Sequence, residues 1–267
     1  MNAHALRITI RRTLPNNTVA LMVATLPMMA SLMKIIATLP TYNEADNIEL
    51  LMAEILAIGP DYEILVVDDN SPDGTYKIVG DAAAQNSRIH IIHRTNERGR
   101  GTAGLAAFRW ARDNGADAVI EMDADFSHAP RFIPSLVQPV REEQADIVIG
   151  SRLVEGGGEQ GRPPSRKIIT LMANTYIRLM LGLPVRDATS GFRVFSRRAL
   201  TTIPWEKMTA RGPEIVQEVL WEARRANLTM TERPILFEER RAGTSTFNRS
   251  IMMKSLLYML KLRLGIR

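Results

Sequence analysis

Cysteine is absent from the 267 residues of this chain. Its absence excludes disulfide bonds and metal sites built on thiolates, and it favours an intracellular location. The remaining composition, with 45% apolar and 24% charged residues, is that of an ordinary globular protein. The length suits one large α/β domain or two small ones.

Long uninterrupted apolar runs are also lacking. A membrane-spanning helix needs about 20 apolar residues, but residues 166–182 contain Asn174 and Arg178, and residues 250–267 contain four Lys and Arg. We expect residues 250–267 to form an amphipathic helix on a membrane surface. Residues 166–182 either lie in the same interface or pack in the core.

The N-terminus has a shorter apolar run, from residue 18 to 32, which Pro27 interrupts and Lys34 closes. No convincing cleavage site marks a signal peptide. We expect residues 1–33 to be an extension outside the main fold, with an extra anchoring segment as the alternative.

Negative charge is scarce in the second part of the chain. Residues 1–150 hold 13 Lys and Arg against 19 Asp and Glu, whereas residues 151–267 hold 21 against 10. An acidic half suits a divalent cation, and a basic half suits an anionic ligand or membrane surface. A solvated basic surface without a ligand is the alternative.

Apolar strand patterns alternate with helical ones from Lys34 onward. This order predicts an α/β fold with a mostly parallel twisted sheet and helices on both faces, similar to a Rossmann fold. Strands are predicted at residues 34–40, 62–69, 88–94, 117–125 and 145–152, with helices at 48–58, 76–85, 101–115 and 213–227.

Carboxylates follow two of the predicted strands. Asp68 and Asp69 end one strand, and Asp123 and Asp125 follow another. The carboxyl ends of parallel strands share one crevice, so we expect these four side chains to converge. Hard oxygen ligands favour Mg²⁺ or Mn²⁺, which commonly binds one or two carboxylates together with substrate phosphates. The expected ligand of this metal ion is therefore a substrate diphosphate.

A dinucleotide-binding loop is the competing interpretation. "GRGTAG" at residues 99–104 matches G-x-G-x-x-G, and Asp123 lies about twenty residues further on. The fingerprint requires its glycines directly after a strand, but residues 95–98 intervene. A dehydrogenase is therefore disfavoured.

Six motifs together resemble those of family 2 glycosyltransferases, in the order that this family shows. They are "LPTYNEADNI", "VVDDNSPDGT", "GRGTAG", "DADFSHAP", "GSRLVEGG" and "DATSGFRVF". Among these enzymes the chain looks most like the dolichyl- or polyprenyl-phosphate mannosyltransferases. The resemblance implies a GT-A fold over residues 34–249, with a nucleotide-sugar and metal half at 34–152 and an acceptor half at 153–249.

The resemblance also implies roles for particular residues. Asp123 and Asp125 would hold Mg²⁺ or Mn²⁺, Ala124 would pack beside them, and Arg152 and Arg240 would bind phosphates, for which a guanidinium fork is well shaped. The nucleotide-binding residues would be Pro40, Tyr42, Glu44, Val67 and Asp69, with Asp68 in a supporting role.

The chain departs from the family pattern at two positions. Ser127 stands where the metal loop often has glutamine, so the third protein ligand is either Ser127 or water. Thr246 stands where a phosphate-binding lysine is usual, and Arg241 or Arg249 could supply that charge.

Other polar residues have weaker assignments. The acceptor of this family is already anionic, so it needs positioning more than a catalytic histidine, and His128 is expected to shape the metal loop. Asp187 and Arg193 are expected to lie over the donor sugar or acceptor, or else to pair with each other. Glu218 is expected to lie on a packed helix near the crevice.

The resemblance implies an inverting transfer of mannose from GDP-mannose to a polyprenyl monophosphate. UDP-glucose or another donor or acceptor is the alternative, and a non-catalytic nucleotide-sugar-binding protein is a third hypothesis. The chain ends without the transmembrane helices of related glucosyltransferases, which leaves room for a separate membrane protein partner. We expect a cytoplasmic protein at the inner membrane face, with no nucleic acid partner.

Overall fold

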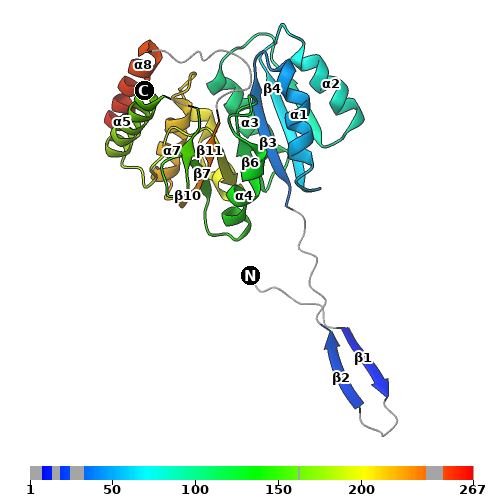
Figure 1. Ribbon diagram of the computed structural model, residues 1–267. Helices are drawn as coiled ribbons and strands as arrows, with labels where there is room; N and C mark the ends of the chain where they lie inside the picture. Colours follow the sequence, from blue (N-terminus) through cyan, green and yellow to red (C-terminus); the bar gives the residue numbers. More distant parts are fainter. Residues whose placement is uncertain (1–7, 14–18, 25–32, 162, 239–248, 267) are drawn as a thin grey trace. The chain divides into compact units, whose positions relative to one another are not determined.

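The computed structural model describes residues 8–13, 19–24, 33–161, 163–238 and 249–266 (Figure 1). The chain divides into two compact units, residues 1–32 and 33–267. In the first unit β1 (Ile8–Thr13) pairs antiparallel with β2 (Val19–Ala24). Part of the apolar N-terminal run is therefore a β-strand.

The second unit is built on a seven-stranded sheet with the order β10-β7-β9-β6-β3-β4-β5. All neighbours are parallel except β9, which runs antiparallel to both β6 and β7. The predicted α/β fold with a mostly parallel sheet is confirmed. The strands are β3 (Ile35–Thr41), β4 (Tyr62–Asp68), β5 (Ile89–His93), β6 (Ala118–Glu121), β7 (Ile147–Ser151), β9 (Arg193–Ser196) and β10 (Met230–Pro234), and a separate parallel pair joins β8 (Gly158–Glu159) to β11 (Leu236–Phe237).

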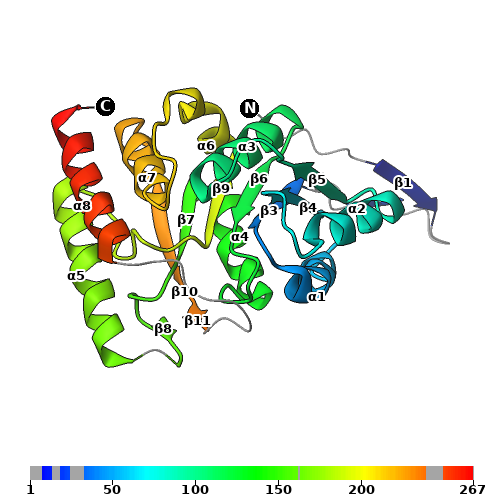
Figure 2. The ribbon, with the colours of Figure 1, turned by 90° about the horizontal axis from the view of Figure 1, so that it is seen from above.

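Helices cover both faces of this sheet (Figure 2). Successive strand residues point to opposite faces, so Ile36 packs in one core cluster while Ala37 packs in the other. The first cluster receives α3 (Arg100–Asp113), α6 (Arg197–Thr202) and α7 (Ile215–Arg225), with contributions from α5 (Pro164–Leu181) and α8 (Arg249–Leu264). The second receives α1 (Ala45–Leu56), α2 (Thr75–Gln85) and α4 (Ile133–Arg141).

Several elements were not predicted from the sequence, and β9, α4 and β10 show why. Strand β9 has only four residues and begins with a charged residue, Arg193, whose side chain is fully buried. Helix α4 contains Pro134 in its first turn and Pro139 in its interior, and proline normally argues against a helix. Strand β10 lies at the sheet edge and ends in Pro234, which an edge strand tolerates.

Candidate active site

The carboxyl ends of β3, β4 and β6 lie along one edge of the sheet, because these three strands are parallel neighbours. Asp68 is the last residue of β4, and its fully buried carboxylate accepts hydrogen bonds from Thr41 Oγ1 (2.8 Å) and from Ser71 N–H (2.9 Å). Asp68 thus ties the end of β3 to the loop after β4, and its supporting role at a nucleotide site stays a prediction.

Asp69 fastens the segment before α3 to the end of β4. Its Oδ1 accepts a hydrogen bond from Arg94 Nε (2.7 Å), and its Oδ2 accepts one from Gly99 N–H (2.8 Å). A pocket of about 260 Å³ opens beside these contacts, and the guanidinium of Arg98 lies 3.6 Å from the ring centre of Tyr42 at this pocket. Its lining residues are Tyr42, Asp69, Asn70, Arg94, Thr95, Asn96, Glu97 and Arg98.

The other predicted nucleotide residues lie around this edge. Pro40 lies one residue before the end of β3. Glu44 occupies the N-cap position of α1, and its N–H donates to Thr75 Oγ1 (3.0 Å). The side chains of Val67 and Ala124 are buried in the core clusters. A contact between Val67 and a nucleotide would therefore come from its backbone.

The loop after β6 presents the two predicted metal ligands. Asp125 is 3% exposed, and its Oδ1 accepts a hydrogen bond from Ser127 N–H (3.0 Å). Asp123 N–H donates to Nδ1 of His128 (2.9 Å), whose ring stacks on Phe192 at a centroid distance of 5.0 Å. Burial lowers the pKa of His128, which suits an unprotonated Nδ1 that accepts this bond. His128 therefore shapes the loop that carries both carboxylates.

Arg100 was missed by the sequence analysis. Its Nη2 lies 2.7 Å from Oδ1 of Asp123. The Asp123 carboxylate, with smaller effects from Glu121 and Asp125, raises the pKa of Arg100 above its ordinary value. The signal available in the sequence was the gathering of Arg94, Arg98 and Arg100 in one short segment after a strand.

Arg152, predicted to bind phosphate, is held by a carboxylate in this structure. Its Nε and Nη2 donate to the two oxygens of Asp187, each at 2.7 Å, and Nη2 also donates to Thr189 Oγ1 (2.7 Å). Burial alone would raise the pKa of Asp187, but the hydrogen bonds from Arg152 hold it below its ordinary value. Arg152 is therefore a preorganised cation.

Asp187 and Arg193 do not pair with each other, so that alternative was wrong. Arg193 is fully buried and pairs instead with Glu121, the residue opposite it in the β6–β9 register. Glu218, also fully buried, accepts hydrogen bonds from the backbone N–H groups of Thr209 (3.1 Å) and Ala210 (2.8 Å), so it shapes that loop. Arg193 lies in a strand, where cross-strand packing buries it.

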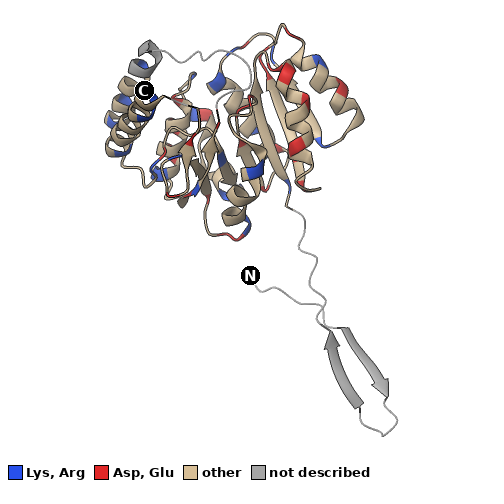
Figure 3. Ribbon diagram, viewed as in Figure 1, with Lys and Arg blue, Asp and Glu red and all other residues tan. Residues whose placement is uncertain are grey.

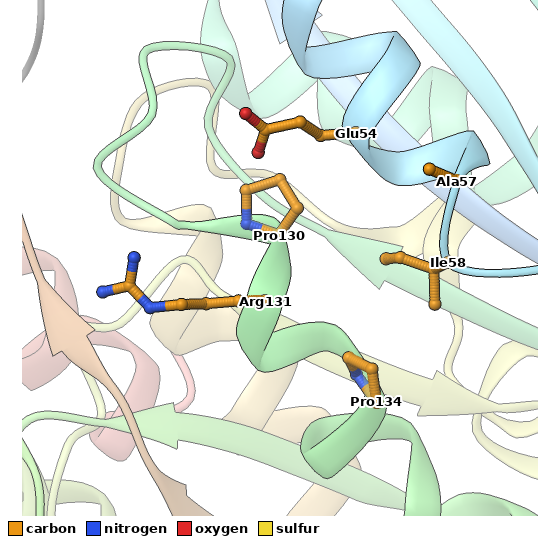
Figure 4. A pocket seen from close by; sticks show the side chains of 6 residues that line it. All are labelled: Glu54, Ala57, Ile58, Pro130, Arg131 and Pro134. Carbon is orange, nitrogen blue, oxygen red and sulfur yellow. The ribbon is translucent and has the colours of Figure 1, made fainter.

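Arg240 and Arg241, which were considered for phosphate binding, and Thr246, which stands in the usual lysine position, lie outside the described residues. A second pocket of about 290 Å³ lies between α1 and the start of α4 (Figure 4). None of the predicted site residues lines it; its lining is Glu54, Ala57, Ile58, Pro130, Arg131 and Pro134.

The donor set of the loop after β6 fits a hard divalent cation. Among the described residues no cluster of three or more His, Asp or Glu could hold a metal ion. Asp68 and Asp69 therefore do not join Asp123 and Asp125 in one metal-binding cluster, so the expected convergence of the four carboxylates was wrong. Asp123 and Asp125 would supply two carboxylates, which is the number that Mg²⁺ commonly takes from a protein when water and substrate phosphates complete its coordination. Ser127 as a third ligand stays a prediction.

Two curated relatives cover most of the chain. Residues 37–203 match the family described as glycosyl transferase family 2. An undecaprenyl-phosphate mannosyltransferase from Micrococcus luteus is 41% identical over 180 residues, which are 67% of this chain and 73% of that protein. A polyprenol monophosphomannose synthase from Mycolicibacterium smegmatis is 38% identical over 195 residues, or 73% of each chain.

A solved structure has the same fold. Glucosyl-3-phosphoglycerate synthase from Mycobacterium tuberculosis superposes with a TM-score of 0.64 at 22% identity, over 88% of this chain and 81% of that one. The family match and the two curated relatives both identify a glycosyltransferase. The chain belongs to glycosyl transferase family 2 and is a glycosyltransferase with the GT-A fold.

Proposed function

We propose that this enzyme transfers mannose from GDP-mannose to a polyprenyl (dolichyl-type) monophosphate, with inversion at the anomeric carbon, to give polyprenyl-phosphate-mannose. The observation that carries the proposal is the similarity to two relatives, at 41% and 38% identity, which are both named for mannose transfer to a polyprenyl phosphate. UDP-glucose or another sugar nucleotide is the second candidate donor, because the neighbouring synthase from Mycobacterium tuberculosis is described with UDP-glucose.

Mg²⁺ or Mn²⁺ is the proposed cofactor, and Asp123 and Asp125 would hold it. Two structural neighbours support this choice, since the glucosyl-3-phosphoglycerate synthase and a mannosyltransferase from Pyrobaculum calidifontis were each crystallised with Mn²⁺. The bound metal would offset the negative charge that develops on the leaving nucleoside diphosphate.

The protein's own side chains supply positioning. Asp69 holds Arg94 and Gly99, and with them the wall of the pocket in which we place the nucleotide. Arg152 is the proposed phosphate-binding residue, and in this structure its guanidinium is held by Asp187 and by Glu159, whose Oε1 lies 3.2 Å from Nη1. The acceptor phosphate is already anionic, so orientation of the two substrates is the main requirement.

The identity of the donor is tested by the rise in the protein's melting temperature when a sugar nucleotide binds. In the presence of Mn²⁺, GDP-mannose is expected to raise the melting temperature more than UDP-glucose, because a ligand that binds only the folded state stabilises it by mass action. The reverse order would move the assignment to a UDP-sugar. Stabilisation by NADH with none from either sugar nucleotide would contradict a sugar-nucleotide site altogether.

A membrane surface is the proposed location of the acceptor, on the cytoplasmic side. Helices α5 and α8 lie side by side (Figures 1 and 2), and Tyr176 Oη donates to the Leu256 carbonyl (3.2 Å). Asn174, Ile177 and Leu181 are the buried residues of α5, and the two apolar ones join the core, so core packing accounts for one side of this helix and not for the rest. Its exposed apolar side chains, with those of the C-terminal segment, are Ile168, Ile169, Leu171, Met172, Leu179, Leu257, Leu260, Leu264 and Ile266.

The charges of these helices favour an anionic bilayer. Neither α5 nor α8 contains Asp or Glu, whereas both carry Lys and Arg (Figure 3). Basic side chains beside exposed apolar ones are typical of helices that lie in the membrane interface. Within the described residues, no helix is both long enough and apolar enough to cross a bilayer.

Two substitutions test the membrane surface. Met172 and Leu179 are 67% and 80% exposed, and changing both to Glu should reduce co-sedimentation with phosphatidylglycerol vesicles about tenfold, because apolar burial and charge attraction are both weakened. Leu50→Glu, at a 51% exposed position of α1, is the matched control and should leave vesicle binding unchanged. Equal vesicle binding by the wild type, the double variant and Leu50→Glu would show that the exposed side of α5 is not the membrane-binding surface.

A further inference from the structure

Arg100 occupies an unfavourable position for a cation. It is the first residue of α3, and the N-terminus of a helix carries partial positive charge that disfavours a guanidinium there. No acidic residue lies in the first turn of α3 to offset it. The interaction that holds the side chain comes from another element, namely Asp123 in the loop after β6, at 2.7 Å.

The guanidinium of Arg100 is only partly satisfied by this contact. Its Nε is shielded from solvent and has no hydrogen-bond partner among the described residues. The side chain as a whole is 37% exposed, so it has a path to move outward. Space for the guanidinium comes from Gly191, where any side chain would overlap Nη2 of Arg100.

The charges of the loop show what Arg100 does to a metal site. Glu121 is engaged by the buried Arg193, whereas Asp123 is engaged by Arg100 and is also one of the two proposed metal ligands. A divalent cation at Asp123 would bring a second positive charge close to the guanidinium of Arg100, and the two cations would repel each other. The negative charge of a diphosphate would offset this repulsion and would offer the guanidinium a bidentate partner.

We propose that Arg100 is an internal cation that competes with the divalent metal for Asp123, so that metal and nucleoside diphosphate bind cooperatively. The metal alone binds weakly, because Arg100 must leave Asp123 or be tolerated beside the ion. When the diphosphate arrives, Arg100 moves to its phosphate oxygens and the metal takes both carboxylates. The inference rests on the proposed function, because it takes Asp123 and Asp125 as ligands of a metal that carries a nucleoside diphosphate.

Calorimetric titration with Mn²⁺ tests this role without a turnover assay. Arg100→Leu should bind Mn²⁺ alone about tenfold more tightly than the wild type, since one close positive charge is removed. GDP should strengthen Mn²⁺ binding by a factor about tenfold smaller in this variant than in the wild type. Arg100→Lys keeps the charge and should retain the strong dependence on GDP. A merely structural role for Arg100 would change Mn²⁺ affinity in the opposite direction, since a damaged site binds metal less well.

Asp125→Asn separates failure of this inference from failure of the proposed metal site. Mn²⁺ binding that is lost in Asp125→Asn but is the same in Arg100→Leu and the wild type would overturn the role of Arg100 alone. Mn²⁺ binding that survives Asp125→Asn, whether this change is made in the wild type or in Arg100→Leu, would overturn the metal site on which the inference rests.

Discussion

Asp125→Asn is expected to reduce sugar transfer by at least about a thousandfold, with little change in melting temperature. The asparagine keeps an oxygen that can accept the hydrogen bond from Ser127 N–H, which Asp125 Oδ1 now accepts at 3.0 Å. What it removes is the negative charge of one of the two proposed metal ligands. Initial rates at saturating Mn²⁺ and donor, together with a thermal unfolding curve, measure both effects.

The matched control is Asp113→Asn, which neutralises a 62% exposed carboxylate at the end of α3. This variant should turn over at the wild-type rate, because its charge lies on the protein surface outside the loop after β6. Near-wild-type turnover by Asp125→Asn would contradict the assignment of the carboxylate pair. A collapse of its melting temperature would instead assign Asp125 to the fold.

Glu121→Leu is expected to lower the free energy of unfolding by about 3–5 kcal/mol, the usual cost of leaving a buried charge without its partner. Arg193 is fully buried and Glu121 is 4% exposed. Burial lowers the pKa of Arg193, and the Glu121 carboxylate opposes that shift. Urea denaturation followed by circular dichroism measures the loss.

A double substitution separates the ion pair from the packing around it. Glu121→Leu with Arg193→Met replaces both charges by apolar groups and should recover most of the stability. Lys34 pairs with Glu63 at the surface, where the two side chains are 35% and 22% exposed. Lys34→Met should therefore lower the free energy of unfolding by less than about 1 kcal/mol. If Glu121→Leu lowers the free energy of unfolding no more than Lys34→Met does, the ion pair between Glu121 and Arg193 does not stabilise the fold.

The strands that carry the site were predictable from the sequence. Buried parallel strands form continuous apolar runs, and each predicted strand from residue 34 to residue 152 coincides with one of the five strands β3, β4, β5, β6 and β7. The end of such a run is visible when carboxylates follow it, as Asp68 and Asp123 do. The fold class and the position of the acidic loop follow from these two signals.

The pairing of the charged side chains was not predictable, because it depends on contacts between segments far apart in the chain. Arg152 meets Asp187 across 35 residues, and Arg193 meets Glu121 across 72. Strand β9 inserts antiparallel between β6 and β7, which separates Arg193 from Asp187 and buries it against Glu121. The partner of Arg100 was hidden for the same reason, since only the folded chain brings α3 beside the loop after β6.

Transfer of labelled sugar to a short polyprenyl phosphate measures the proposed reaction itself. The protein is supplied with GDP-mannose, and separately with UDP-glucose, each with Mn²⁺ and with the metal chelated. We expect lipid-linked mannose from GDP-mannose, formed only with metal and not by Asp125→Asn. Lipid-linked mannose formed equally well after chelation, or no lipid product from a protein that binds both nucleotides on vesicles, would contradict it.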